Sequence, residues 1–101
     1  MEPQEIIQNA IRLFGEKNQL IVAIEELSEL QKSLCKRLRG DEENLEQIAE
    51  EVADVQIMLE QIVPLLRIGA DVEVFREYKL HRLQNRIEKE WGRIWSNDVE
   101  V

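Results

Sequence analysis

The chain has 101 residues and a formal net charge of -8, and 34% of its residues are charged. This length predicts one domain spanning residues 1–101, with a small core. The acidic balance argues against a general nucleic-acid binder and against attraction to an anionic membrane. The lone cysteine, Cys35, has no internal disulfide partner, which is typical of the reducing cytoplasm, so a cytoplasmic location is predicted. We expect neither a signal peptide nor a membrane-spanning segment.

Hydrophobic periodicity predicts an all-α fold with four successive helices. The predicted helices cover about residues 3–15, 17–38, 45–66 and 72–91. Pro3 suits the first turn of a helix, and Gly15 is expected to end or bend it. Gly40 and Gly92 are expected to follow the ends of later helices. The third helix should weaken near Pro64, and the tail from about residue 93 should be loosely ordered.

The third predicted helix carries an acid where it should enter a core. Its apolar residues recur at three- and four-residue steps at Leu45, Ile48, Val52, Val55, Leu59, Ile62 and Leu66. At about 100° per residue, Glu51 falls beside this stripe in the sector of Met58, and Asp54 falls just outside it. An unpaired carboxylate there is costly, so we expect a cation to meet it.

The second predicted helix repeats this arrangement. Its stripe consists of Leu20, Ile24, Leu27, Leu34 and Leu38, while Glu26 lies in one row with Val22 and Leu30. Glu26-x-x-Glu29 and Glu51-x-x-Asp54 each place two carboxylates on one side of a helix. Two such helices packed antiparallel can bring four carboxylates together, and Mg²⁺ takes oxygen ligands of this kind. The alternative is a solvated acidic face, which is common in so charged a chain.

Three basic residues, Lys79, Arg82 and Arg86, form a row at the border of the apolar side of the fourth predicted helix. This row either pairs with nearby acids such as Glu88 and Glu90 or holds phosphate oxygens beside a metal.

The paired acidic motifs resemble those of a known family. Segment 25–30, Glu-Glu-Leu-Ser-Glu-Leu, followed by segment 50–54, Glu-Glu-Val-Ala-Asp, is similar to the ExxE…ExxD signature of the MazG-like nucleoside triphosphate pyrophosphohydrolases. The resemblance covers roughly Phe14 to Arg86, including the basic row, and is to the small phage-type and bacterial members. It implies a four-helix MazG-like bundle completed by oligomerisation, as a homodimer or a dimer of dimers.

The resemblance also implies an activity. Members hydrolyse nucleoside triphosphates, NTP or dNTP, to the monophosphate and pyrophosphate, with Mg²⁺ or Mn²⁺ activating the water that attacks the α-phosphate. Position by position, the metal-binding and catalytic acids would be Glu26, Glu29, Glu51 and Asp54. The preceding acids Glu25 and Glu50 are candidate accessory acids. The phosphate contacts would come from Lys79, Arg82 and Arg86.

Two other function classes stay open. A di-iron carboxylate bundle uses Glu-x-x-His on two helices; the single histidine, His81, follows Tyr78 at that spacing, which argues against this class. A non-catalytic helical oligomerisation or nucleotide-binding module would use the acids only as a solvated face. In every case we expect at least a dimer, because Ile21 and Ile57 stand away from the main stripes of their helices.

Overall fold

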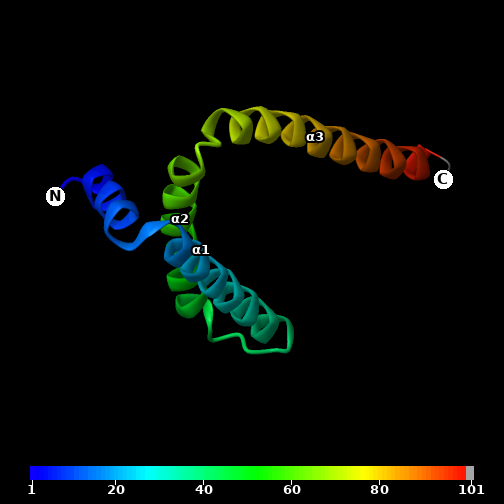
Figure 1. The fold of residues 1–101 in the computed structure, drawn as a ribbon. Helices are drawn as coiled ribbons and strands as arrows, with labels where there is room; N and C mark the ends of the chain where they lie inside the picture. Colours follow the sequence, from blue (N-terminus) through cyan, green and yellow to red (C-terminus); the bar gives the residue numbers. More distant parts are fainter. Residues whose placement is uncertain (100–101) are drawn as a thin grey trace. The chain divides into compact units, whose positions relative to one another are not determined.

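The computed structural model describes residues 1–99, with side chains described to residue 96, and these residues form three α-helices and no strand (Figure 1). α1 spans Pro3–Leu38, α2 spans Leu45–Leu66 and α3 spans Gly69–Val99. The all-α class is therefore confirmed for this part of the chain. The chain divides into two compact units, Met1–Arg67 and the α3 unit from Ile68 onward, and each is described by itself. The assignment of residues 1–101 to one domain stays a prediction.

α1 combines the first two predicted helices and is kinked at Gly15. This residue has φ 83° and ψ 167°, a conformation that side-chain-bearing residues rarely adopt. Nothing lies within 4 Å of a Cβ built there, so the backbone angles and not crowding favour glycine. The prediction that Gly15 ends or bends the first helix is confirmed. The prediction of a four-helix bundle is wrong for residues 1–99, because they contain three helices, of which α1 and α2 form a hairpin.

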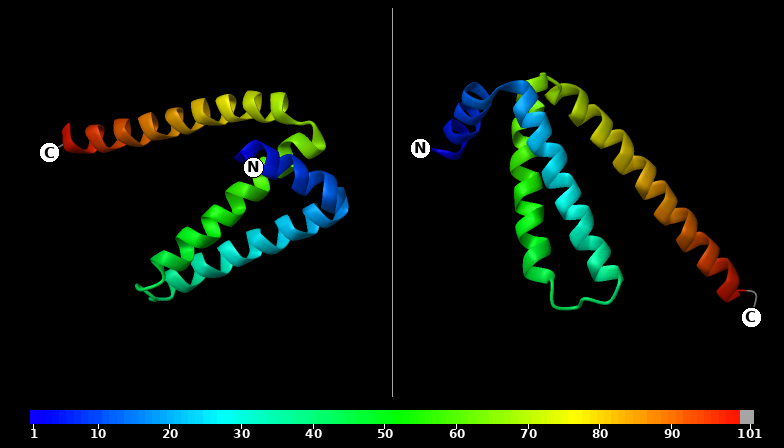
Figure 2. Two further views of the ribbon diagram at one scale, coloured as in Figure 1. Left: turned by 90° about the vertical axis from the view of Figure 1, so that its left-hand side faces the viewer. Right: turned by 60° about the horizontal axis from the view of Figure 1, so that its bottom comes forward.

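α1 and α2 lie side by side and antiparallel, joined by residues 39–44 (Figure 2). The connection is held by side chains from both of its ends. Arg37 Nη1 donates to the Glu42 carbonyl at 2.7 Å, and Asn44 Nδ2 donates to the Ser33 carbonyl at 2.9 Å. Gly40 has φ 106°, as expected for a glycine that follows a helix end. These contacts fix the end of the hairpin at which α1 is joined to α2.

The seam between α1 and α2 is largely polar. Its buried apolar residues are Ala23, Val55 and Met58, while its buried polar residues are Gln19, Ser33, Asn44 and Gln61. Gln19 Nε2 donates to Gln61 Oε1 across the seam. The small side chains of Ala23 and Ser33 let the two helices approach closely, and the amides satisfy each other there.

The predicted apolar stripes form this seam only in part: Val55 of the α2 stripe is buried there, and Leu20, Ile48 and Ile62 are half-buried. On α1, Ile24, Leu27, Leu34 and Leu38 are exposed, and on α2, Leu45, Val52, Leu59 and Leu66 are exposed. The stripes sit roughly a quarter turn from the residues that meet across the seam, at about 100° per residue. Two helices alone can bury one narrow strip of each, and here the strip carries the acids and amides. The exposed stripes form what we call the apolar face of the hairpin.

α2 ends two residues beyond Pro64, so the predicted weakening appears as the last turn of the helix. The following residue, Arg67, is left-handed with φ 56°, and its N–H donates to the Pro64 carbonyl at 3.2 Å. This geometry closes the helix as a C-terminal cap.

α3 continues past Gly92 to Val99, so the predicted helix end at Gly92 is wrong. The loose order expected from about residue 93 stays a prediction. Residues 100–101 lie outside the described residues. Glycine inside a helix costs about 1 kcal/mol, and local contacts offset part of it. Arg93 pairs with Glu90 at 2.7 Å, and Ser96 Oγ donates to the Gly92 carbonyl at 2.9 Å. None of the described helices is long and apolar enough to cross a bilayer.

Candidate metal centre

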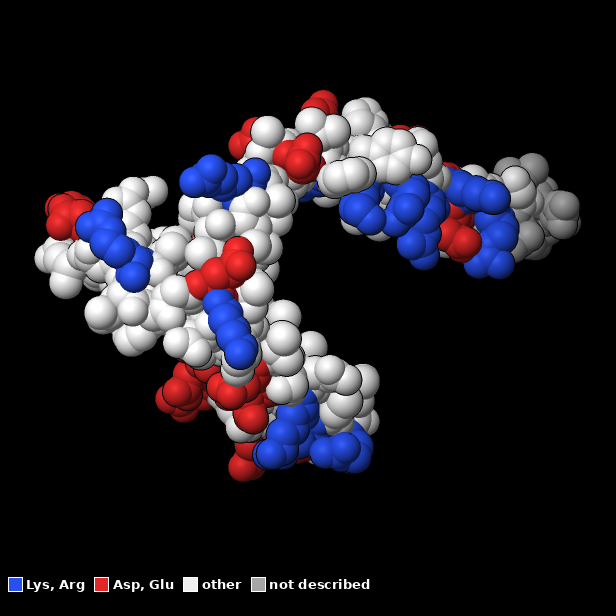
Figure 3. Space-filling view, in the orientation of Figure 1, with Lys and Arg blue, Asp and Glu red and all other residues white. Residues whose placement is uncertain are grey.

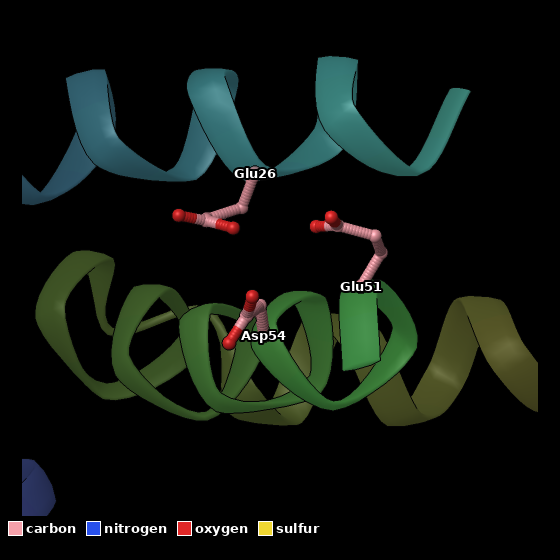
Figure 4. A group of neighbouring side chains, drawn as sticks. All are labelled: Glu26, Glu51 and Asp54. Atoms are coloured by element: carbon pink, nitrogen blue, oxygen red, sulfur yellow. The ribbon is translucent and has the colours of Figure 1, made fainter. Parts of the chain in front are cut away.

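Three carboxylates converge between α1 and α2. One oxygen each from Glu26, Glu51 and Asp54 lies within 4.8 Å of the other two. Figure 4 shows Glu26 extending from α1 toward α2, while Glu51 and Asp54 extend from α2 toward α1. All three side chains are half-buried. We call these residues the acid cluster.

Helix periodicity explains why the three acids meet. Glu51 and Asp54 stand one turn apart on α2, next to the buried residues Val55 and Met58. Glu26 follows buried Ala23 by three residues on α1. The antiparallel packing of the hairpin then places the middle of one helix opposite the middle of the other. The prediction that Glu51 lies in the sector of Met58 is confirmed.

The environment raises the pKa of Glu26 above its ordinary value. The largest cause is loss of hydration at the seam, followed by the negative charge of Asp54 and a hydrogen bond with Asp54 that favours protonated Glu26. The charges of Glu51 and Glu29 add smaller increases. Burial and like charge thus act in the same direction on this carboxyl group.

The pKa of Glu51 is raised as well. Loss of hydration is again the largest cause, followed by the charges of Asp54, Glu29 and Glu50. Within the compact unit of residues 1–67, no lysine or arginine forms an ion pair with any member of the acid cluster. The expected cationic partner is therefore not a side chain of this unit.

The remaining predicted acids lie around the cluster. Glu29 is exposed on α1 and stands outside the group within 4.8 Å, although its charge acts on Glu26 and Glu51. Glu25 and Glu50 are also exposed, and Glu50 is close enough to influence Glu51. The structure thus brings together three of the four predicted ligands and places the fourth beside them.

The predicted phosphate-binding residues Lys79, Arg82 and Arg86 are exposed on α3, which belongs to the second compact unit. Figure 3 shows Lys and Arg gathered along one side of this helix. None of the three forms an ion pair within the described part of the chain, so the pairing with Glu88 or Glu90 considered above is not observed there. Their contact with phosphate stays a prediction.

The donor set of the acid cluster fits a hard divalent cation. Mg²⁺ binds oxygen at about 2.1 Å, so neighbouring ligands on one side of an octahedral ion lie roughly 3.0 Å apart. The oxygens of the cluster, all within 4.8 Å of one another, would move closer together by side-chain rotation to reach that spacing. Three carboxylates on one side of an octahedral ion leave positions for water and phosphate oxygens.

Two polar contacts of the seam were not foreseen. Gln19 precedes Glu26 by seven residues, and Gln61 follows Asp54 by seven, so each amide shares a helix face with an acid. This spacing was the available signal. At the other end of the seam, buried Asn44 donates a hydrogen bond from its amide nitrogen to the Ser33 carbonyl. Its Oδ1 has no hydrogen-bond partner among the described residues.

Comparisons of the chain with protein-family models, with curated proteins and with solved structures give no match. A role for the acid cluster is therefore argued from its geometry and from the paired acidic motifs.

Proposed function

We propose that this chain is a MazG-like, Mg²⁺-dependent pyrophosphohydrolase that converts a nucleoside triphosphate to the monophosphate and pyrophosphate. The observation that carries the proposal is the convergence of Glu26, Glu51 and Asp54 without a basic partner in residues 1–67. Like-charged groups held together in a folded protein raise the free energy of the fold, so such a cluster needs a compensating ligand. A divalent cation carrying phosphate oxygens is that ligand in this proposal.

The acid cluster would hold Mg²⁺, or Mn²⁺ in its place, with Glu29 completing the ligand set by a side-chain adjustment. When bound, the ion neutralises charge on the phosphate oxygens and makes water a stronger nucleophile. Glu29 and Glu50 both stand near enough to Glu51 to shift its pKa. A carboxylate in this position can accept the proton that the attacking water loses. Glu25 faces solvent one residue before Glu26 and is given no role.

Phosphate binding would come from the row of Lys79, Arg82 and Arg86. These side chains are exposed and unpaired with acids in the described residues, so their donors are available to phosphate oxygens. They would neutralise the departing pyrophosphate. This activity fits a cytoplasmic location, as proposed from the lone cysteine.

Self-association would complete the bundle. The apolar face of the hairpin exposes Ile24 and Leu27 on α1 and Val52 and Leu59 on α2. A contiguous exposed apolar surface of this kind marks an interaction site. Two hairpins packed through these faces would form a four-helix bundle as a homodimer, or as half of a dimer of dimers.

The test is pyrophosphate release from a panel of NTPs and dNTPs, each with Mg²⁺, with Mn²⁺ and with EDTA. We expect release in either metal and none in EDTA. Analysis of the products should give the nucleoside monophosphate and pyrophosphate in equal amounts, because the bond broken lies at the α-phosphate. Metal-dependent nucleotide binding without pyrophosphate release would indicate a binding module. The absence of both binding and release would overturn the metal-site proposal.

A further inference from the structure

Asn44 lies directly before α2 and is buried at the end of the seam where α1 is joined to α2. Its carbonyl accepts the first hydrogen bond of α2, from the Ile48 N–H at 3.0 Å. Its side chain crosses to α1 and donates to the Ser33 carbonyl at 2.9 Å. Ser33 is buried too, so this bond is shielded from water. Asn44 therefore ties the beginning of α2 to one point on α1.

Stability alone does not explain an asparagine at this position. The Oδ1 atom of Asn44 is buried and has no hydrogen-bond partner among the described residues, which is unfavourable for the folded state. The side chain also makes no capping bond to α2, although capping is the usual use of asparagine before a helix. A leucine of similar size would avoid the unpaired oxygen. Asn44 is therefore better explained by what its single bond to Ser33 aligns.

The spacing along both helices places this bond in line with the acid cluster. Asn44 precedes Glu51 by seven residues on α2, and Ser33 follows Glu26 by seven residues on α1. Seven residues make two turns, so each pair lies on the seam side of its helix. Because the helices are antiparallel, joining Asn44 to Ser33 brings Glu51 level with Glu26. Figure 4 shows these two acids extending toward each other's helix.

We propose that Asn44 is a positioning residue, whose bond to Ser33 sets the register of α2 on α1 and so brings Glu51 opposite Glu26. A single buried asparagine fixes register in paired helices in the same way, at a cost in stability. The Gln19–Gln61 pair holds the other side of the acid cluster, and two separated contacts keep α2 from pivoting about either one. The inference rests on the proposed function, because it gives the aligned acids their use in binding metal.

The variant Asn44→Leu separates register from stability. We expect it to keep its helices by circular dichroism and to keep or raise its midpoint in chemical denaturation, because the unpaired oxygen is gone. The register is measured in EDTA as the distance between spin labels attached through Gln31→Cys and Glu60→Cys in a Cys35→Ser background. Both labelled positions are exposed. With Asn44 present the distance should be narrowly distributed, and in Asn44→Leu it should spread by up to about 5.4 Å, one helical turn.

An equally narrow distance in folded Asn44→Leu would overturn the proposal, because the Gln19–Gln61 pair would then hold the register alone. If the leucine side chain prevents folding, Asn44→Ala makes the same test with a smaller side chain. The matched control is Asn18→Leu. Asn18 is an exposed asparagine on α1 that also donates at 2.9 Å to a carbonyl, but to Phe14 of its own helix. Its replacement should leave the distance unchanged, and an equal spread in the control would contradict the proposal.

Mg²⁺ binding without nucleotide supplies a second measurement. Thermal melts over a series of Mg²⁺ concentrations give the concentration that half-saturates each protein. Asn44→Leu should need about tenfold or more Mg²⁺, since indirect partners of a metal ligand cost 10- to 100-fold in affinity when removed. A purely structural role would change the melting temperature but not this concentration, and that result would overturn the proposal. If Mg²⁺ stabilises no variant and not the wild type, the proposed function fails, and the label distance in EDTA still decides whether Asn44 sets the register.

Discussion

The hairpin of α1 and α2 and the single helix α3 use their apolar residues in different ways. The hairpin buries three amides and holds three half-buried acids beside its apolar residues, and most residues of its apolar stripes are exposed. In α3 every side chain from Asp71 to Ser96 is exposed, and large apolar residues recur along the helix at steps of three and four. The hairpin places three carboxylates where their negative charges repel one another. The polar side chains of α3 are exposed to solvent instead.

In the proposed function, this difference separates groups that would serve chemistry from groups that would serve association. Half-buried acids without a counter-charge destabilise the hairpin. A contribution to stability therefore does not explain their position. An exposed apolar face on a charged helix is instead suited to a partner.

Glu51→Gln tests whether the hairpin acids serve chemistry. We expect pyrophosphate release to fall by more than about 100-fold, since even indirect partners of a metal ligand cost 10- to 100-fold when removed. The control is Glu46→Gln, an exposed acid on the same helix outside the acid cluster, which should hydrolyse normally. Equal rates in both variants would show that the acids form a solvated face.

Removing one seam amide tests how far buried polar pairing stabilises the hairpin. Gln61→Leu leaves the Gln19 amide buried without its partner, and we expect a loss of about 1–3 kcal/mol in chemical denaturation. The double variant Gln19→Leu/Gln61→Leu removes both amides and should recover most of that stability. A double variant as unstable as the single one would mean that packing, and not pairing, explains the effect.

Removal of a basic residue on α3 tests whether this helix also takes part in chemistry. Lys79→Ala and Arg86→Ala should each raise KM by about tenfold or more, because a hydrogen bond to a charged group is worth roughly 1.5–3 kcal/mol. Mg²⁺ affinity measured without nucleotide should not change. Arg12→Ala, an exposed basic residue on α1, is the control. Unaltered kinetics in the α3 variants would confine α3 to association.

The pH dependence of stability in EDTA tests the repulsion within the acid cluster. The pKa values of Glu26 and Glu51 are raised from 4.5, so the folded state keeps protons that the unfolded state has released. Stability should therefore decrease as pH rises from about 4.5 through the raised pKa values. Glu51→Gln should flatten this decrease and melt at a higher temperature than the wild type at neutral pH.

Added Mg²⁺ should reverse this loss of stability in the wild type. Binding to the folded state alone contributes about 2.7 kcal/mol at a metal concentration 100 times Kd. Glu51→Gln should gain clearly less, which thermal melts with and without Mg²⁺ will show. Equal gains in stability for both proteins would indicate that the metal binds outside the acid cluster.

Much of the fold follows from local sequence signals. The bounds of α2 and the kink at Gly15 agree with the prediction because proline, glycine and the apolar period act within a few residues. The end predicted at Gly92 was wrong because a single glycine costs about 1 kcal/mol in a helix, and the contacts of Arg93 and Ser96 help to carry the helix through. A glycine marks a helix end reliably only where the chain must turn.

The site was predicted in part. Sequence spacing placed Glu26, Glu51 and Asp54 correctly on facing sides of two helices, because helix periodicity fixes direction. It could not place Glu29, because a residue one turn along the helix can lie beside a seam or away from it. The rotation of both helices was also missed: apolar periodicity identifies a face to be covered, but it does not say which partner covers it.

The Gln19–Gln61 pair has a consequence for the register of the hairpin. If α2 slid by one turn, about 5.4 Å along its axis, each amide would lose its partner inside the seam. The same slide would move Glu51 and Asp54 together past Glu26 by more than the 4.8 Å within which the acid oxygens now lie. The amide pair lies two turns from the acids and favours one register of the two helices. The acids are therefore aligned by a contact in which they take no part.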